Sequence, residues 1–222
     1  MFIEQILRFA SIWSVVVPLL LGLFYFGKLS FDLKLVTILV ALSTISQFTD
    51  VFLPKDDSLK NFVYNIYTPL EFLFLNFLFK KYMEGKIDKR IFVVSSISYI
   101  FISILFIYVY GLTAQFLKEW VCVNNLIYTT WILIIFYKQY SLANVIQFNF
   151  STPVFWIFIG LLFYAPVASL YFSVYDYAQQ PNLNGLKSLH HIVNTSMYIC
   201  FAVGIYKDSL LKYSKILNNK RT

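Results

Sequence analysis

The residues best suited to chemistry lie inside otherwise apolar segments, at spacings of one helical turn. Glu71 and His190 are the chief candidates, because a carboxylate and an imidazole can both exchange protons, hold ligands or bind metals. Tyr67 precedes Glu71 by four residues, and Asn194 follows His190 by four. Each pair therefore shares one face of a helix.

Two further segments carry polar stripes of the same kind. Asp50 ends one of them, and Asn124 or Asn125 begins the other. Residues at these spacings fall on one side of a helix, so each stripe faces a single direction. The four stripes are Ser43, Ser46, Gln47 and Asp50; Tyr64, Tyr67, Thr68 and Glu71; Asn124 or Asn125 with Tyr128 and Trp131; and His190, Asn194 and Tyr198, with His191 and Thr195 beside them.

The composition identifies the surroundings of these stripes. Of 222 residues, 59% are hydrophobic, 20% are aromatic and only 13% are charged. Soluble domains carry about 25% charged residues, so a soluble enzyme, a nucleic-acid-binding domain and a disordered chain are excluded. Several apolar runs reach the roughly 20 residues that a helix needs to cross a bilayer.

Seven such runs predict an all-α membrane protein, a single seven-transmembrane-helix bundle over residues 1–222. The run from Ile91 to Leu117 contains no charge. The first run contains Pro18 and lacks a small-residue cleavage site before Lys28, so we expect a retained span. The expected spans are Ile6–Phe26, Leu33–Leu53, Asn61–Met83, Ile91–Leu112, Phe116–Tyr137, Pro153–Tyr175 and Leu186–Tyr206.

The distribution of Lys and Arg predicts the orientation. Alternate sides of the seven spans hold 13 and 5 of these residues. The positive-inside rule then places the N-terminus outside and the C-terminus in the cytoplasm, in the cytoplasmic (inner) membrane, with multiple passes. The net charge of +7 is therefore a topology signal, with the lipid bilayer and not nucleic acid as the partner.

Depth along the helices predicts one outward-facing, hydrated pocket. Asp50 and His190 lie roughly 5 Å inside the outer boundary, Asn124 and Asn194 roughly 12 Å, and Glu71 roughly 16 Å, at 1.5 Å per residue. All of these residues fall in the outer half of the membrane. Because buried ionisable groups in membranes face the bundle interior, we take them as ligand-binding candidates.

For other residues near the stripes we predict only a position or a local effect on the helix. His191 points about 100° away from His190, and we expect it at the membrane interface. Pro69 and Pro166 should kink their helices, and the kink at Pro69 either widens the pocket beside Glu71 or serves packing alone. For Glu71 and His190 themselves, simple interhelical hydrogen bonding is the alternative to a binding role.

Metal and cofactor chemistry has little support in the sequence. A catalytic zinc needs about three protein ligands, which would be Asp50, Glu71 and His190, but the only two histidines are adjacent. A retinal protein is excluded, because no lysine lies between Ser188 and Tyr206. We therefore expect no metal and no cofactor, and the catalytic residues, if any exist, are unknown.

Three stretches together resemble an uncharacterised family of small seven-helix integral membrane proteins of Bacteroidota-type bacteria. They are the run from Tyr64 to Phe72, the run from Pro153 to Trp156 with Gly160 and Tyr164, and His190 with Asn194. The resemblance covers nearly the whole chain. It implies that Tyr67, Glu71, His190 and Asn194 are the family's shared polar positions, although Ser188 and Leu189 stand where that family often has an aromatic residue before the His.

These observations favour a membrane receptor or sensor-like protein whose outward polar pocket binds a small ligand or a proton. Such a protein has no soluble output module in this chain, so it needs a cytoplasmic or membrane signalling partner. The alternatives are an intramembrane lipid-modifying hydrolase and a structural subunit of a membrane complex. Transport is disfavoured, because the inner halves of the spans are strongly apolar, with Asn76 the chief exception.

Overall fold

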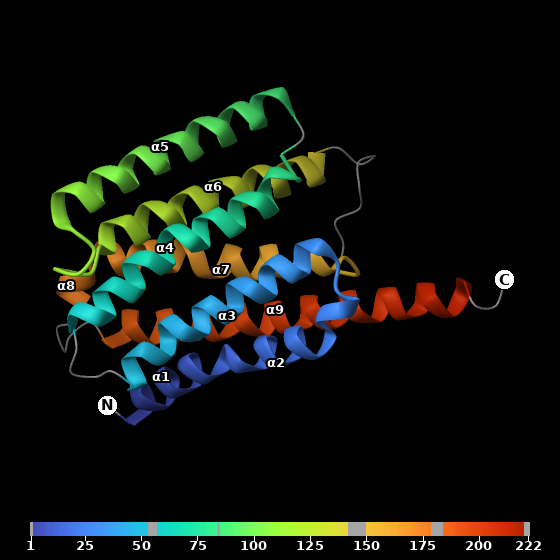
Figure 1. The fold of residues 1–222 in the computed structure, drawn as a ribbon, viewed down its shortest axis with the longest axis horizontal. Helices are drawn as coiled ribbons and strands as arrows, with labels where there is room; N and C mark the ends of the chain where they lie inside the picture. The colour runs from blue at the N-terminus through green and yellow to red at the C-terminus, as the bar shows by residue number, and fades with distance from the viewer. Residues whose placement is uncertain (1, 53–56, 84, 142–149, 179–183, 220–222) are drawn as a thin grey trace.

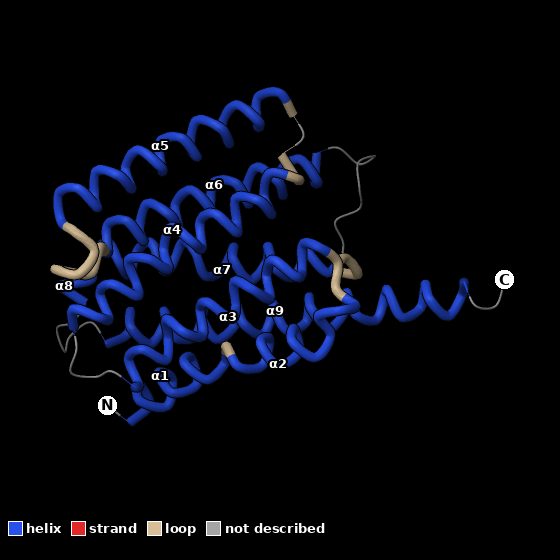
Figure 2. Tube along the Cα trace, in the orientation of Figure 1, coloured by secondary structure: helices blue, strands red, loops and turns tan. Residues whose placement is uncertain are grey.

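The computed structural model describes residues 2–52, 57–83, 85–141, 150–178 and 184–219. Over these ranges the regular structure is entirely helical, as Figure 2 shows. Leu53, Lys55, Lys220 and Arg221 lie outside the described residues, and so does the side chain of Asp50. The predicted all-α class is confirmed for the described part of the chain.

The described helices run along the bundle in seven segments, which we call passes, and six of these are long and apolar enough to cross a membrane. The pass formed by α9 is not among these six, and it carries His190, His191 and Asn194. The elements are α1 (Phe2–Ser14), α2 (Val16–Tyr25), η1 (Phe26–Lys28), α3 (Phe31–Phe52), α4 (Asp57–Lys80), α5 (Lys86–Tyr110), α6 (Lys118–Ser141), α7 (Pro153–Ser173), α8 (Tyr175–Ala178) and α9 (Asn184–Asn219).

Most helix bounds differ by a few residues from the expected spans, and three differences matter most. The first pass is interrupted at Val15, between α1 and α2. Pro18 explains the break, because a proline cannot donate to the carbonyl four residues earlier and its ring clashes with it. The third pass ends at Lys80, before Met83. The last helix runs to Asn219, well past Tyr206, and extends beyond the other helices in Figure 1.

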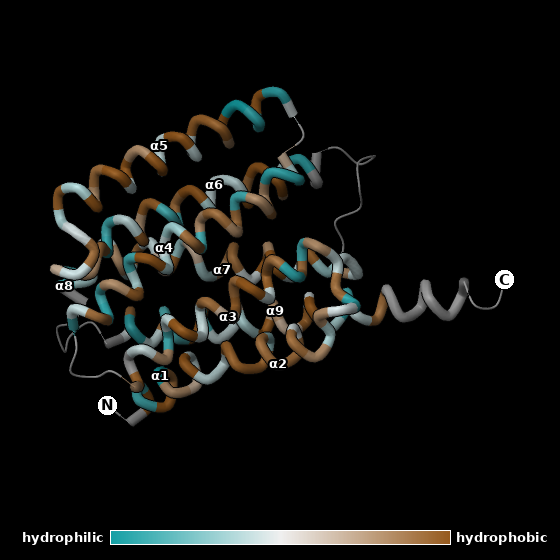
Figure 3. The backbone as a smooth tube through the Cα atoms, viewed as in Figure 1, coloured by the Kyte–Doolittle hydropathy of each residue, from teal (hydrophilic) through white to brown (hydrophobic). Residues whose placement is uncertain are grey.

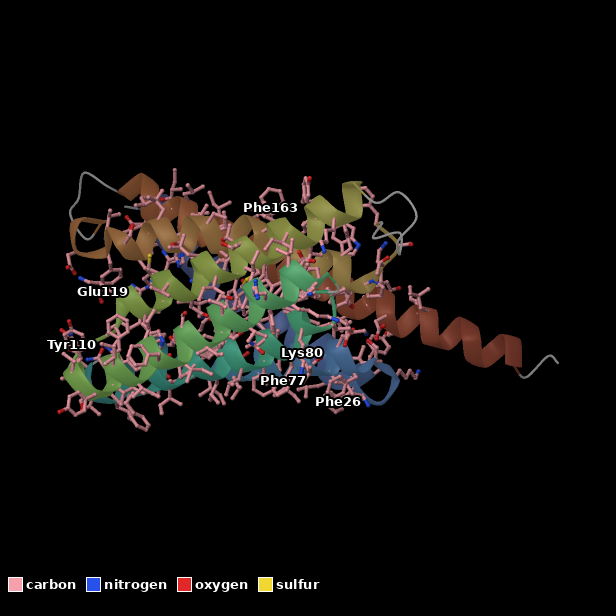
Figure 4. The ribbon with its side chains drawn as sticks, turned by 90° about the horizontal axis from the view of Figure 1, so that it is seen from above. Phe26, Phe77, Lys80, Tyr110, Glu119 and Phe163 are labelled. Carbon is pink, nitrogen blue, oxygen red and sulfur yellow. The ribbon has the colours of Figure 1, made fainter. Side chains whose placement is uncertain are left out.

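Consecutive passes run in opposite directions, so each end of the bundle gathers every second connection (Figure 1). We call the end that holds Lys28, Lys80, Lys81, Lys86 and Lys138 the lysine-rich end, and the opposite end the cavity end. Figure 4 shows Lys80 and Phe26 toward the first, and Tyr110 and Glu119 at the second.

The outer surface of the bundle is apolar. On α5, at one edge of the bundle in Figure 1, the side chains of Phe101 and Ile104 are 62% and 60% exposed. Figure 3 shows this helix hydrophilic at its start and largely hydrophobic beyond it. An apolar face of this size is rare on soluble proteins, so it is compatible with a surrounding lipid bilayer.

Aromatic side chains fill the middle of the bundle. Phe72 stacks on Tyr99 with ring centroids 3.8 Å apart, and Phe79 stacks on Phe158 at 5.0 Å. Trp131 is fully buried, and its indole N–H donates to Ser95 at 2.9 Å, which joins α6 to α5. Burying such large rings contributes strongly to packing, and the indole needs a partner when buried.

Small residues let α7 and α9 approach closely. A Cβ atom added to Gly160 would lie 3.0 Å from the Cβ of Cys200, and one added to Gly204 would lie 2.8 Å from the carbonyl oxygen of Pro153. Glycine is favoured at such contacts in membrane bundles because backbones can then pack directly. The α7–α9 pair therefore forms a fixed wall for the site.

Two carboxylates at the lysine-rich end, Asp32 and Asp88, are paired with cations, whereas Asp208 accepts from the backbone N–H of Ser30 at 2.6 Å. Asp32 accepts from the Lys81 ammonium at 2.6 Å and from the Tyr82 hydroxyl at 3.0 Å. Asp88 forms an ion pair with Lys138 and also accepts from the backbone N–H of Gly85 at 3.1 Å, at the start of α5. These contacts tie α3 to the end of α4 and α5 to α6.

Candidate functional site

A cavity of about 430 Å³ opens in the cavity end of the bundle. Its walls come from α1, α3, α4, α6, α7, α8 and α9 and from Phe116 before α6, so chain segments from both termini meet there. Ligand pockets for small molecules span about 300–1,000 Å³. The lining residues include Arg8, Ser11, Ser43, Ser46, Gln47, Asp57, Lys60, Asn61, Tyr64, Tyr67, Thr68, Glu71, Phe116, Asn125, Tyr164, Tyr171, Phe172, Tyr175, His190, His191, Asn194 and Tyr198.

Glu71 is the deepest α4 residue that lines this cavity. One carboxylate oxygen accepts a hydrogen bond from the Tyr67 hydroxyl at 3.0 Å, and the other accepts from the Asn124 amide at 3.1 Å. Tyr67 precedes Glu71 by one helical turn on α4, while Asn124 reaches it from α6. The carboxylate is thus held between two neutral donors from two helices.

Tyr198 joins α9 to α3 across the cavity wall. Its hydroxyl forms a hydrogen bond with Ser43 and accepts one from the Gln47 amide at 2.6 Å. One turn earlier on α9, Asn194 donates to the Ser11 hydroxyl of α1 at 2.8 Å. These contacts orient one face of α9 toward the cavity.

His190 is packed among aromatic rings. Its imidazole stacks on Tyr171 with centroids 4.5 Å apart and planes 13° from parallel, and Phe172 contacts it edge-on at 5.5 Å. Its Nδ1 atom is buried and has no hydrogen-bond partner, and the same is true of His191. A buried polar atom without a partner is costly, and both residues belong to the lining of the cavity.

The mouth of the cavity carries the charges. Arg8 lies on α1, and Lys60 forms an ion pair with Asp57 at 3.2 Å on the first turn of α4. Asn65, one turn further in, is buried and holds the segment before α6: its amide donates to Leu112 and Gln115, and its oxygen accepts from Leu117.

The inner end of the cavity is closed by apolar packing. Below Glu71 on α4, Phe72, Leu75 and Phe79 are buried and belong to the core. Asn76, the polar exception in this half, donates to Ser96 of α5 at 2.7 Å and lies outside the lining. Between Glu71 and Lys80, α4 therefore carries no polar side chain other than Asn76.

The structure brings most of the predicted site residues together. Glu71, Tyr67, His190 and Asn194 all line the cavity, and Asn124 lies behind the wall and bonds to Glu71. The side chain of Asp50 falls outside the described residues, so its role stays a prediction. Pro69 and Pro166 lie within helices that continue past them.

Two expectations were incomplete. His191 also lines the cavity, and its expected position at the membrane interface stays a prediction. Sequence reasoning also missed Arg8 and Ser11 of α1, although their spacing of three residues places both on one helix face. The aromatic wall of Tyr164, Tyr171 and Phe172 was likewise missed, because packing aromatics and wall aromatics look identical in a sequence.

A metal site receives no support from the described residues. No group of three or more His, Cys, Asp or Glu side chains lies together among them. Cys122 and Cys200 are free thiols on different helices. The zinc set of Asp50, Glu71 and His190 therefore rests on sequence alone.

Comparisons with protein-family models, with curated proteins and with solved structures gave no match. The resemblance to the seven-helix family therefore stays a prediction. Function must be argued from the cavity itself.

Proposed function

We propose that this protein is a membrane receptor or sensor-like protein that binds a small ligand in the cavity at its cavity end. The observation that carries the proposal is that polar side chains from several helices line one cavity of about 430 Å³. Burying polar groups in a membrane protein is costly, so such groups usually pair with one another or form a binding site. Glu71 and His190 act as the recognition groups, with Tyr67 and Asn194 orienting the walls and Asp50 and Asn124 contributing beside them.

The topology belongs to the same proposal. Seven spans, with the cavity end outside and the lysine-rich end in the cytoplasm, agree with the positive-inside rule. The apolar inner half favours a receptor over a transporter, because a cavity that is closed at its inner end can bind a ligand but does not let it cross the membrane. A receptor with short loops passes its signal to a cytoplasmic or membrane partner in the inner membrane.

Native mass spectrometry of the purified full chain tests this function. We expect a stoichiometric excess over the mass of the bare chain, reduced in Glu71→Gln and in His190→Ala. Glu119→Gln is the matched control, because Glu119 is exposed and does not line the cavity. If both cavity variants retain every bound species and every thermal-shift response of the wild type, the proposal fails. Co-purification of a partner with a bare mass would instead favour a structural subunit.

A further inference from the structure

Glu71 is a carboxylate without a cationic partner. Its two hydrogen-bond donors, Tyr67 and Asn124, are neutral. None of the four ion pairs among the described residues includes Glu71. Lys60, the cation on the same helix face of the cavity, lies eleven residues earlier, or roughly 16 Å along the axis at 1.5 Å per residue. It is also paired with Asp57.

A carboxylate at this depth needs a positive charge or a proton. The cavity wall supplies neither a lysine nor an arginine near Glu71, but it does leave open space beside the carboxylate. For the ionised carboxylate, a cation brought by the ligand would supply that positive charge. A ligand anion would instead meet like charge there.

The aromatic wall suits a cation. Tyr164, Phe172 and Tyr198 line the same cavity as Glu71, and so does Tyr171, one face of which stacks on His190. The face of an aromatic ring attracts an ammonium group within about 6 Å of its centroid. Carboxylate and ring faces therefore favour the same sign of charge.

The acceptor capacity of Glu71 favours a cation that carries N–H donors. Each carboxylate oxygen accepts one hydrogen bond from the protein, from Tyr67 or from Asn124, and an ionised carboxylate oxygen can accept a second. A primary ammonium group offers three donors, whereas a quaternary ammonium offers none.

We propose that the ligand carries a primary ammonium group, which donates to the Glu71 carboxylate between the aromatic walls while its body extends toward His190. This inference rests on the proposed function and names the ligand class. The same chemistry can come from a soluble amine or from the ethanolamine headgroup of a lipid.

Three probes of one skeleton test the inference: tyramine, its neutral alcohol tyrosol, and the anion hydroxyphenylpropionate. Each is titrated into the full chain in nanodiscs of phosphatidylcholine, with the thermal midpoint and the Kd as readouts. We expect tyramine to bind the wild type and Glu119→Gln, and to bind Glu71→Gln at least about tenfold more weakly, a difference of 1.4 kcal/mol. Glu71→Asp keeps the charge and should retain a preference for tyramine over tyrosol.

The outcomes separate this inference from the proposed function. If tyrosol or the anion binds as well as tyramine, or if Glu71→Gln keeps full tyramine affinity, the ammonium inference is overturned while the cavity remains a binding site. If none of the three probes binds, the inference also fails. The proposed function is then tested only by the mass excess that native mass spectrometry detects on the purified chain. Repeating the titration with phosphatidylethanolamine in the nanodiscs identifies the source: competition indicates the lipid headgroup, and unchanged tyramine affinity indicates a soluble amine.

Discussion

At the lysine-rich end, Asp32 and Asp88 each lie against a lysine, whereas Glu71 at the cavity end is held by a phenol and an amide. The side chains of Asp32 and Asp88 are only 10% and 8% exposed, so pairing compensates the cost of removing them from water. Each pair also joins two segments of the bundle. Each of these two carboxylates therefore has a cationic partner within the chain itself.

Glu71 has the opposite arrangement. Its neutral donors satisfy hydrogen bonds but leave the charge uncompensated, and open space lies next to it. The comparison teaches that a neutral partner together with a place in the cavity lining distinguishes Glu71, because Asp208 also has a neutral donor but lies outside the lining and joins α9 to the backbone of Ser30. Three substitutions examine this difference through the free energy of unfolding.

The largest effect is expected at the lysine-rich end. Asp88→Ala should lower the free energy of unfolding by about 3 kcal/mol, because it leaves the Lys138 ammonium unpaired in a half-buried position and removes an acceptor at the start of α5. Reversible denaturant unfolding in mixed micelles measures it. Lys89→Ala, an exposed neighbour, is the control. A loss below about 0.5 kcal/mol would mean that the pair adds nothing to the fold.

An intermediate effect is expected between the two helices that Tyr198 joins. Tyr198→Phe keeps the ring but removes the hydroxyl that bonds to Ser43 and Gln47. The net contribution of such bonds is about 1 kcal/mol, and we expect a loss of that size in the same unfolding assay. Tyr206→Phe, on an exposed part of α9, should change little. Equal losses in both variants would show that the cavity hydroxyl has no special role.

The smallest effect is expected at Glu71 itself. Glu71→Gln keeps the shape, and the amide oxygen can still accept from Tyr67 or Asn124, so the free energy of unfolding should fall by no more than about 0.5 kcal/mol, and removing an uncompensated charge should raise it. Asp88→Asn is the matched carboxylate-to-amide control and should cost about 2 kcal/mol, because Lys138 loses its counter-charge. If Glu71→Gln destabilises the bundle as much as Asp88→Asn does, Glu71 is a structural group and the contrast between the two ends disappears.

Much of the fold could be predicted because apolar run length and polar periodicity are local properties. The apolar run after Ile91 already predicted α5, and the four-residue spacing from Tyr67 to Glu71 already placed both on one face of α4. Boundaries were harder. The break at Val15 required weighing Pro18 as an interruption within the first span, and α9 continues past Tyr206 to Asn219.

The site was predictable only in part, because its contacts join residues far apart in the chain. Periodicity placed Glu71, His190 and Asn194 on polar faces, but it could not show that Asn124 bonds to Glu71 or that Asn194 bonds to Ser11. It also could not distinguish Tyr171, which stacks on His190, from aromatic residues that only pack.

The sequence by itself determined a helical chain suited to a membrane and the polar faces of its helices, because hydropathy and helical geometry act over neighbouring residues. Only the tertiary structure decided which faces meet, since that depends on close approaches such as the α7–α9 contact at Gly160. It also decided that Asp88 has a lysine beside it while Glu71 has a cavity. Which side chain lies next to a charged group depends on how the helices pack, and that packing depends on all the helices together.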